Sequence, residues 1–170
     1  MRSEQEVNRA IDTYADTVRR ICMLHLKNAS DTEDIFQEVF LKYALSAASF
    51  TSEEHEKAWI IRVTVNKCKD LLKSVFRKRT IPMEEGMELP QEGREDHGEV
   101  LEAVLSLPAK YKNVVYLHYY EGYSAVEISR ILQKNVNTVY ALLSRARRML
   151  QERLGGEDED WLLYTSDAAD

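Results

Sequence analysis

Residues 124–150, SAVEISRILQKNVNTVYALLSRARRML, predict two helices joined by a short turn. Ser124 is a good N-cap residue for the first helix, and residues 133–135 supply the turn. A short helix, a tight turn and a longer basic helix form the geometry of a DNA-reading helix-turn-helix. The expected apolar positions are Val126, Ile128, Ile131 and Leu132 in the first helix and Val139, Leu142, Leu143 and Ala146 in the second.

The second of these helices is expected over residues 136–153, and either Asn135 or Asn137 can cap it. Its far end carries arginines that suit phosphate oxygens or guanine edges. They are Arg145, Arg147 and Arg148. Generic pairs of helices are common, so this pattern favours DNA binding without establishing it.

Further helices are predicted before the helix-turn-helix. Helical periodicity resumes near Glu99. Pro108 then opens another helix in its first turn, where a missing backbone N–H does least harm. That helix is expected to end at Gly122.

The N-terminal part of the chain predicts three or four helices. The first covers roughly residues 5–27, and a capping box of the form Ser30-x-x-Glu33 starts the second. The third runs from about Glu53 to Arg79. Their apolar stripes are Val7, Ile11, Tyr14, Val18 and Ile21; Ile35, Phe36, Val39, Phe40 and Tyr43; and Ile61, Val65, Cys68, Leu72 and Val75.

Charge is distributed unevenly along the chain, whose net charge is −6. Residues 81–100 hold seven acidic residues and one basic residue, and residues 157–170 hold six acidic residues and no basic one. The remaining 16 acidic and 22 basic residues give the helical body about +6. Two segments concentrate the positive charge, with eight bases against one acid in residues 57–79 and five against one in residues 134–153. This distribution favours a polyanionic partner over two merely solvated helix faces.

We therefore expect an all-α fold with two small helical modules joined by a flexible acidic linker. Prolines and glycines interrupt the helical periodicity in the linker. The expected divisions are a first module over residues 1–79, the linker over 80–98, a helix-turn-helix module over 99–154 and an acidic tail over 155–170. The last ten residues, WLLYTSDAAD, continue no helical pattern and resemble translated sequencing-adaptor sequence, which leaves open whether they are native.

A polar stripe also follows the third predicted helix, at steps of four, three, four and four residues from Arg62 to Arg77. Its members are Arg62, Asn66, Lys69, Lys73 and Arg77. Basic residues with an amide suit single-stranded or melted DNA, whose bases can be stacked and hydrogen-bonded. Nearby Trp59 is expected in the core. The second helix instead presents Asp34, Gln37, Glu38 and Lys42, which suit a basic or helical protein partner but also fit an ordinary amphipathic helix.

Several classes of protein are disfavoured. The four histidines are scattered, and no nucleophile has a base at recognisable spacing, so we expect no enzymatic activity and no catalytic residues. Cys22 and Cys68 have no ligand partners at zinc spacing, so neither a structural metal, a cofactor nor a disulfide framework is expected. No apolar run is long enough for a membrane span, and the first residues lack a signal peptide's apolar stretch. These features predict a cytoplasmic protein without membrane insertion.

Three segments, in this order, resemble bacterial sigma factors of the extracytoplasmic-function (ECF) group. ASDTEDIFQEVFLKYA is similar to the polymerase-binding helix of region 2, and EKAWIIRVTVNKCKDLLKS is similar to the helix for the melted proximal (−10) promoter element. LSLPAKYKNVVYLHYYEGYSAVEISRIL with VNTVYALLSRARRML resembles region 4, which reads the upstream (−35) element. The resemblance covers about residues 5–154, including the linker.

The resemblance implies a transcription initiation factor with a role for each segment. Contacts to the clamp of core RNA polymerase would come from Asp34, Gln37, Glu38 and Phe40. The non-template strand of the −10 element would meet Arg62, Asn66, Lys69, Asp70 and Lys73, while the loop 48–56 selects a flipped base. The −35 major groove would face Thr138, Tyr140, Ala141, Ser144 and Arg145, with Arg147 and Arg148 near phosphates. The linker would thread the polymerase's RNA path, and an anti-sigma factor is an expected further partner.

The chain departs from the family pattern at three positions. Gln133 stands where the turn usually carries glycine, which implies some strain if the residue is left-handed. Tyr140 and Leu142 stand where lysine or arginine is frequent, which leaves the −35 base preference open. Two rival functions also remain: a stand-alone helix-turn-helix regulator that binds duplex DNA tightly by itself, and a helical adaptor that binds only proteins.

Overall fold

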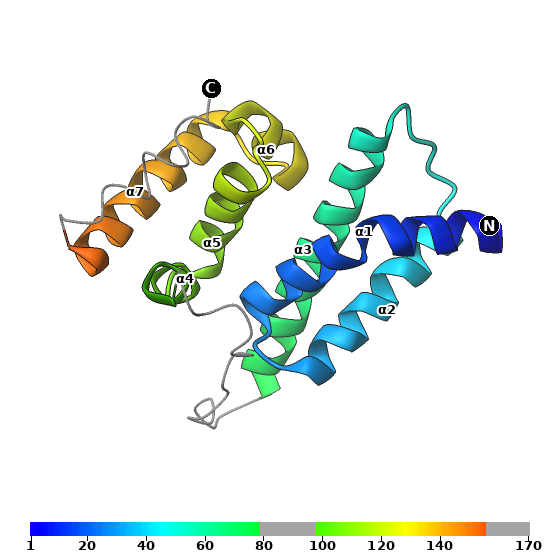
Figure 1. The fold of residues 1–170 in the computed structure, drawn as a ribbon, viewed down its shortest axis with the longest axis horizontal. Helices are drawn as coiled ribbons and strands as arrows, with labels where there is room; N and C mark the ends of the chain where they lie inside the picture. Colours follow the sequence, from blue (N-terminus) through cyan, green and yellow to red (C-terminus); the bar gives the residue numbers. More distant parts are fainter. Residues whose placement is uncertain (79–97, 156–170) are drawn as a thin grey trace. The chain divides into compact units, whose positions relative to one another are not determined.

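The computed structural model describes residues 1–78 and 98–155. The chain forms two compact units, Met1–Pro90 and Gln91–Asp170, and each is described by itself. The first contains α1 (Glu4–His25), α2 (Ala29–Leu45) and α3 (Glu53–Lys78) (Figure 1). The second contains α4 (Gly98–Leu105), α5 (Ala109–Val115), the π-helix η1 (Tyr116–Tyr120), α6 (Ala125–Leu132) and α7 (Val136–Leu154).

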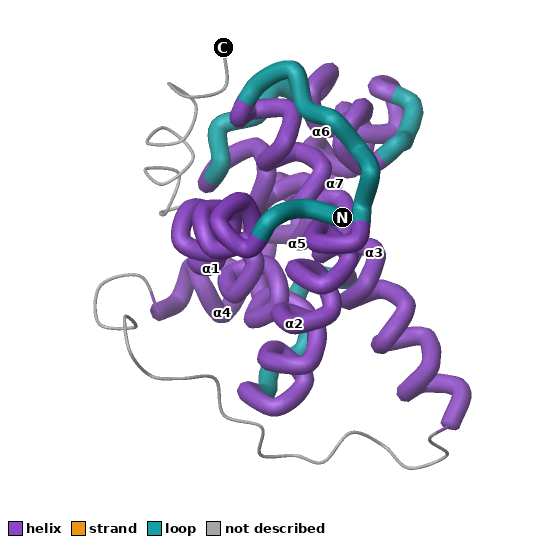
Figure 2. Tube along the Cα trace, turned by 90° about the vertical axis from the view of Figure 1, so that its right-hand side faces the viewer, coloured by secondary structure: helices purple, strands orange, loops and turns teal. Residues whose placement is uncertain are grey.

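Helices joined by loops and turns account for both described ranges, without a strand, which confirms the all-α prediction (Figure 2). The expected linker and tail lie outside the described residues except for Gly98 and Gly155.

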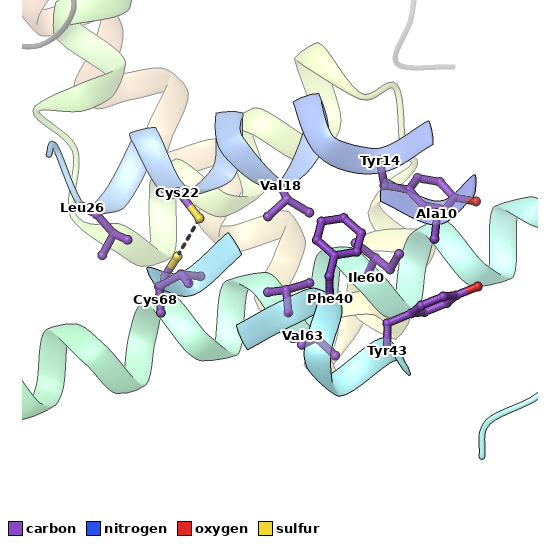
Figure 3. Packing of buried hydrophobic residues seen from close by; sticks show 12 residues of the cluster. Ala10, Tyr14, Val18, Cys22, Leu26, Phe40, Tyr43, Ile60, Val63 and Cys68 are labelled. Atoms are coloured by element: carbon purple, nitrogen blue, oxygen red, sulfur yellow. Dashed lines mark hydrogen bonds between the residues drawn. The ribbon is translucent and has the colours of Figure 1, made fainter. Parts of the chain in front are cut away.

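In the first unit, each of the three helices packs against the other two. Their shared core contains Tyr14 and Val18 from the predicted stripe of α1 (Figure 3). Ile21 is also buried, and Val7 and Ile11 pack against the core cluster. Burial of an aliphatic or aromatic side chain stabilises a fold by about 1.5–3 kcal/mol, so this stripe alone explains why α1 forms despite its polar surface.

Cys22 of α1 and Cys68 of α3 meet inside this core. The two buried thiols are free, and their Sγ atoms lie 3.9 Å apart (Figure 3). The hydrogen bond to Cys22 and burial raise the pKa of the Cys68 thiol above its ordinary value, so the thiol stays protonated. The pair therefore packs α1 against α3 as two small apolar side chains do.

The start of α2 differs from the predicted capping box. Asn28, not Ser30, is the N-cap residue, and its side chain accepts a hydrogen bond from the backbone N–H of Asp31 at 2.7 Å. The Asn28 amide also donates to the Asp31 carboxylate at 2.8 Å. Lys27 has a left-handed backbone (φ 57°), which turns the chain before Asn28, so the helix begins one residue before Ser30.

The turn chemistry of the second unit follows the sequence closely. Ser124 and Glu127 form a reciprocal capping box at the start of α6. Gln133 ends that helix in the left-handed conformation (φ 55°), as expected for the position where glycine is usual. Asn135, rather than Asn137, caps α7 and accepts from the backbone N–H of Asn137 at 2.8 Å.

The helix predicted from Pro108 to Gly122 is present from Ala109 to Tyr120, but its geometry changes partway. Pro108 is the N-cap residue rather than part of the first turn, and α5 gives way to the wider π-helix η1 after Val115. A wider turn moves the side chains around the axis, and three consecutive residues, Tyr116, Leu117 and His118, are buried there. His118 Nδ1 donates to the backbone carbonyl of Tyr123 at 2.7 Å, which ties η1 to the residue before the cap of α6.

None of the helices in the described ranges combines the length and apolar character that a bilayer-spanning segment needs.

Candidate nucleic-acid and protein interfaces

The outer side of α2 carries three of the four residues assigned to a protein partner. Asp34, Gln37 and Glu38 are exposed there on successive turns, and we call them the α2 face. Phe40 is only 4% exposed, and its ring centroid lies 4.8 Å from that of Phe36. Phe40 is therefore a core residue, as the apolar periodicity of α2 predicted, and its side chain does not lie on the surface assigned to it by resemblance.

Two leucines extend the α2 face and were missed by sequence reasoning. Leu41 and Leu45 follow Gln37 at steps of four and are 59% and 61% exposed. Their signal in the sequence is that they fall outside the buried stripe of α2. Exposed apolar side chains rimmed by polar groups are a feature of protein-interaction surfaces.

The polar stripe of α3 lies away from the core of the first unit. Asn66, Lys69 and Lys73 are exposed, and Arg62 is half-buried. Asp70, assigned to the same DNA strand, is also exposed. About a quarter turn around the helix from the stripe, Ile61, Val65 and Cys68 are buried.

The charges of this stripe are unneutralised within the described part of the first unit. Neither Arg62, Lys69 nor Lys73 takes part in an ion pair there. The neighbouring Lys67 does, since its Nζ lies 4.0 Å from the carboxylate of Glu38 on α2. The stripe therefore presents positive charge and an amide to solvent, a combination that suits a polyanion.

The loop assigned to a flipped base is shorter than predicted. Only residues 46–52 lie between helices, because residues 53–56 form the first turn of α3. Phe50 holds the loop against the unit: its ring lies 6.3 Å from that of Tyr43, stacked, and 5.7 Å from Trp59, edge to face. Trp59 is partly buried against the core, as expected.

A buried carboxylate lies where the loop enters α3. Glu56 is 6% exposed and accepts hydrogen bonds of 2.8 Å from Tyr14 Oη and Tyr43 Oη, one on each oxygen. Arg9 Nη2 lies 2.8 Å from both oxygens. The two tyrosines come from α1 and α2 and point to the same end of the core (Figure 3). Glu56 thus joins all three helices.

The network shifts the ionisation of its members. Burial favours the neutral form of Glu56, but the hydrogen bonds from Arg9, Tyr43 and Tyr14 together hold its pKa below the ordinary 4.5. Burial and the hydrogen bond to Glu56 raise the pKa of Tyr14 and Tyr43 above the ordinary 10.0. At neutral pH, one carboxylate is therefore ionised among neutral phenols and the Arg9 cation.

The outer side of α7 presents the residues assigned to the −35 element. Its inner side buries Val139, Leu142, Leu143, Ala146 and Leu150. Leu142 is thus a core residue, whereas Tyr140 is 56% exposed. The exposed members of the assigned set are Thr138, Tyr140, Ala141, Ser144, Arg145 and Arg148.

Arg147 differs from its two neighbouring arginines. It is half-buried, its Nε donates to the hydroxyl of Tyr119, and its guanidinium lies 5.6 Å from the centre of that ring. Arg147 thus packs α7 against the π-helix, and any phosphate contact would use what remains of its exposed edge.

Comparisons with known proteins agree with these two units. Residues 10–79 match the family model "Sigma-70 region 2", and residues 97–150 match "Sigma-70, region 4". The chain is 31% identical over 142 residues to RNA polymerase sigma factor SigV of Bacillus subtilis, covering 82% of this chain and 85% of the relative. It is 27% identical over 161 residues to ECF RNA polymerase sigma factor SigW of the same organism, covering 85% and 86%.

A solved structure supports the fold. The sigma factor RpoE, in complex with the anti-sigma factor NepR from Bartonella quintana, matches with a TM-score of 0.70 at 20% identity, over 91% of this chain and 99% of that chain. The helix-turn-helix, the exposed basic stripe and these matches have one explanation. The chain belongs to the extracytoplasmic-function group of bacterial RNA polymerase sigma factors, which direct transcription initiation.

Proposed function

We propose that the protein divides promoter recognition between its two units. The α2 face contacts the clamp of core RNA polymerase, with Leu41 and Leu45 as its apolar extension. The stripe of α3 holds the non-template strand of the −10 element, and loop 46–52 receives a base that leaves the duplex. Helix α7 lies in the major groove of the −35 element.

The observation that carries this proposal is the stripe of Arg62, Asn66, Lys69 and Lys73 on α3, whose cations form no ion pair among the residues that the structure describes. A stand-alone regulator that reads duplex DNA through α7 has no use for a second basic surface with an exposed amide. A surface of this kind suits single-stranded DNA, because the phosphates attract the cations while Asn66 hydrogen-bonds an unstacked base. Promoter opening then draws on binding energy alone, with no catalytic group.

The second unit supplies the register on duplex DNA. Arg145, Ser144 and Tyr140 lie on the exposed side of α7, where base edges are read, and Arg148 lies near enough to the same side for a phosphate. Residues 80–98 join the units as the linker, and the polymerase sets their spacing. Each unit alone binds duplex DNA weakly, since avidity requires both sites at a fixed distance.

The roles of the two units imply the binding partners of the protein. Core RNA polymerase and promoter DNA place the protein in the cytoplasm. An anti-sigma factor is a further partner, because the similar sigma factor RpoE is recorded in complex with one. Such a partner would regulate the protein by covering surfaces that polymerase or DNA needs.

Asn66→Ala tests the role of the stripe. The holoenzyme formed with wild-type protein is first used to select duplex promoter DNA from a randomised pool. Opening of that DNA is then followed by the permanganate reactivity of its thymines. The variant should lower promoter opening by about five-fold or more, because one contact to a base is lost, and its affinity for core polymerase should be unchanged. Asn8→Ala, which removes another exposed amide from α1, is the matched control. Equal losses in opening and polymerase affinity would refute the role in base capture.

A further inference from the structure

Arg2 brings the first residues of the chain against the end of α2. Its backbone N–H donates to the carbonyl of Ala44 at 2.9 Å, and its Nε donates to the carbonyl of Tyr43 at 3.1 Å. These carbonyls belong to the last turn of α2, and that of Tyr43 also accepts from the backbone N–H of Ser46 at 3.2 Å. Figure 1 shows the N-terminus beside this end of α2, where loop 46–52 begins.

The same side chain also holds the loop itself. Arg2 Nη2 donates to the carbonyl of Ala48, in the middle of loop 46–52. Its guanidinium lies 4.5 Å from the centre of the Tyr43 ring and 5.1 Å from that of Phe50. The side chain is only 14% exposed, although Arg2 is the second residue of the sequence. A planar guanidinium is suited to this position, because its nitrogens reach two acceptors while its face covers an aromatic ring.

The far side of the loop is fixed by α3. The Phe50 ring meets His55 at 5.3 Å and Trp59 at 5.7 Å, both edge to face. Tyr43, beneath the guanidinium, is in turn held by its hydroxyl on Glu56. Loop 46–52 therefore has one aromatic residue packed on α3 and one carbonyl held by Arg2.

We propose that Arg2 is a positioning residue for base selection: its fork between Tyr43 and Ala48 holds loop 46–52 in the shape that receives the base leaving the −10 duplex. This inference rests on the proposed function, since it assumes that the loop meets DNA. Arg2 is not itself required to touch the base. Its effect is therefore on which base is preferred, and polymerase binding is independent of it.

The test uses the holoenzyme and a pool of single-stranded DNA with a randomised stretch, from which captured molecules are sequenced. Wild-type protein is expected to enrich a base at several adjacent positions. Arg2→Ala should lower the enrichment at one of these positions by about five-fold or more and leave the other positions unchanged. A change of about five-fold corresponds to the smallest effect usually seen when one base of a recognised site is replaced. Glu6→Gln is the matched control, because it removes only the 3.6 Å ion pair between Arg2 and Glu6.

Two further measurements separate positioning from other roles. Arg2→Lys keeps the charge but cannot donate to the carbonyls of Tyr43 and Ala48 with two nitrogens of one planar group, so it should not restore the lost enrichment. Restored enrichment would mean that Arg2 acts as a cation toward phosphate, and it would overturn the inference. In a Trp161→Phe background, the emission of Trp59 should shift in Arg2→Ala but not in Glu6→Gln, since Phe50 packs on Trp59. An unchanged enrichment profile in Arg2→Ala would also overturn the inference. A wild-type holoenzyme with no base preference would overturn the proposed function itself, and the role of Arg2 with it.

Discussion

Arg9 and Glu56 are 47 residues apart, yet Nη2 of the arginine lies 2.8 Å from both oxygens of the carboxylate. The glutamate side chain is 7% exposed and the arginine side chain 46%. A buried carboxylate is costly unless hydrogen bonds satisfy it, and Tyr14 and Tyr43 supply the other two. This contact fixes the first turn of α3 against α1, and with it the end of the loop proposed to meet DNA.

Removing the charge of Glu56 should destabilise the first unit. Glu56→Gln replaces a carboxylate that accepts from three side chains with an amide whose NH₂ group faces those same donors. The free energy of unfolding should fall by about 1.5–3 kcal/mol, the range for hydrogen bonds to a charged group. Denaturant unfolding followed by circular dichroism measures it. Glu54→Gln, which changes an exposed carboxylate in the same turn, is the control and should change little; equal effects of the two would count against the network.

The same network predicts how stability depends on pH. The pKa of Glu56 is lower in the folded protein than the ordinary 4.5, so its contribution is present above that value and is lost as pH falls through the folded pKa. The pKa values of Tyr14 and Tyr43 are raised above 10.0, so their contribution is present below pH 10 and is lost as pH rises further. The stability difference between wild type and Glu56→Gln should therefore be constant from about pH 5 to 9 and shrink in acid. Unfolding measured across this range checks it, and a difference that grows in acid would contradict the assigned direction.

The α2 face should be required for polymerase binding but not for folding. Changing Asp34→Ala together with Gln37→Ala removes a carboxylate and an amide that are both exposed. Binding to core RNA polymerase should be abolished while helicity is retained, because interface contacts of this kind are concentrated in a few side chains. Gln5→Ala with Asp16→Ala removes the same two groups from the exposed side of α1 and serves as the control. Unchanged binding by the α2 double variant would refute the assignment of this face.

Arg145 should contribute to recognition of the −35 element. Arg145→Ala removes an exposed guanidinium from the outer side of α7, and Arg153→Ala removes one from the last turn of the same helix. We expect the first change to weaken holoenzyme binding to a selected promoter by roughly 5- to 100-fold, the worth of one base contact, and the second to have little effect. On promoter DNA with a substituted −35 element, wild-type protein and Arg145→Ala should bind with the same affinity. A loss that persists on the substituted DNA would indicate phosphate contact rather than base reading.

The sequence predicted those features that depend on residues close together in the chain. The stripe of α1, the N-cap residue Ser124 and the left-handed Gln133 each follow from a few neighbouring residues. The N-cap residue of α2 was predicted wrongly, because Asn28 and Ser30 are both good cap residues and the structure uses Asn28. The helix itself begins at Ala29, near Ser30 as predicted.

Features that depend on distant residues could not be predicted from local patterns. The partners of Glu56 are separated from it by 13 to 47 residues, and Arg2 reaches Ala48 across 46 residues. Phe40 illustrates the opposite case: its periodicity predicted a core position, and the structure buries it, while the surface role came only from resemblance.

The most direct test of the central claim is the affinity of the purified protein for bacterial core RNA polymerase, measured by fluorescence anisotropy beside its affinity for duplex DNA alone. A sigma factor with two weak DNA-reading units should bind polymerase tightly and free duplex DNA only feebly, with the weak DNA binding lost further as salt rises. Tight binding to duplex DNA without binding to polymerase would contradict the account and indicate a stand-alone regulator.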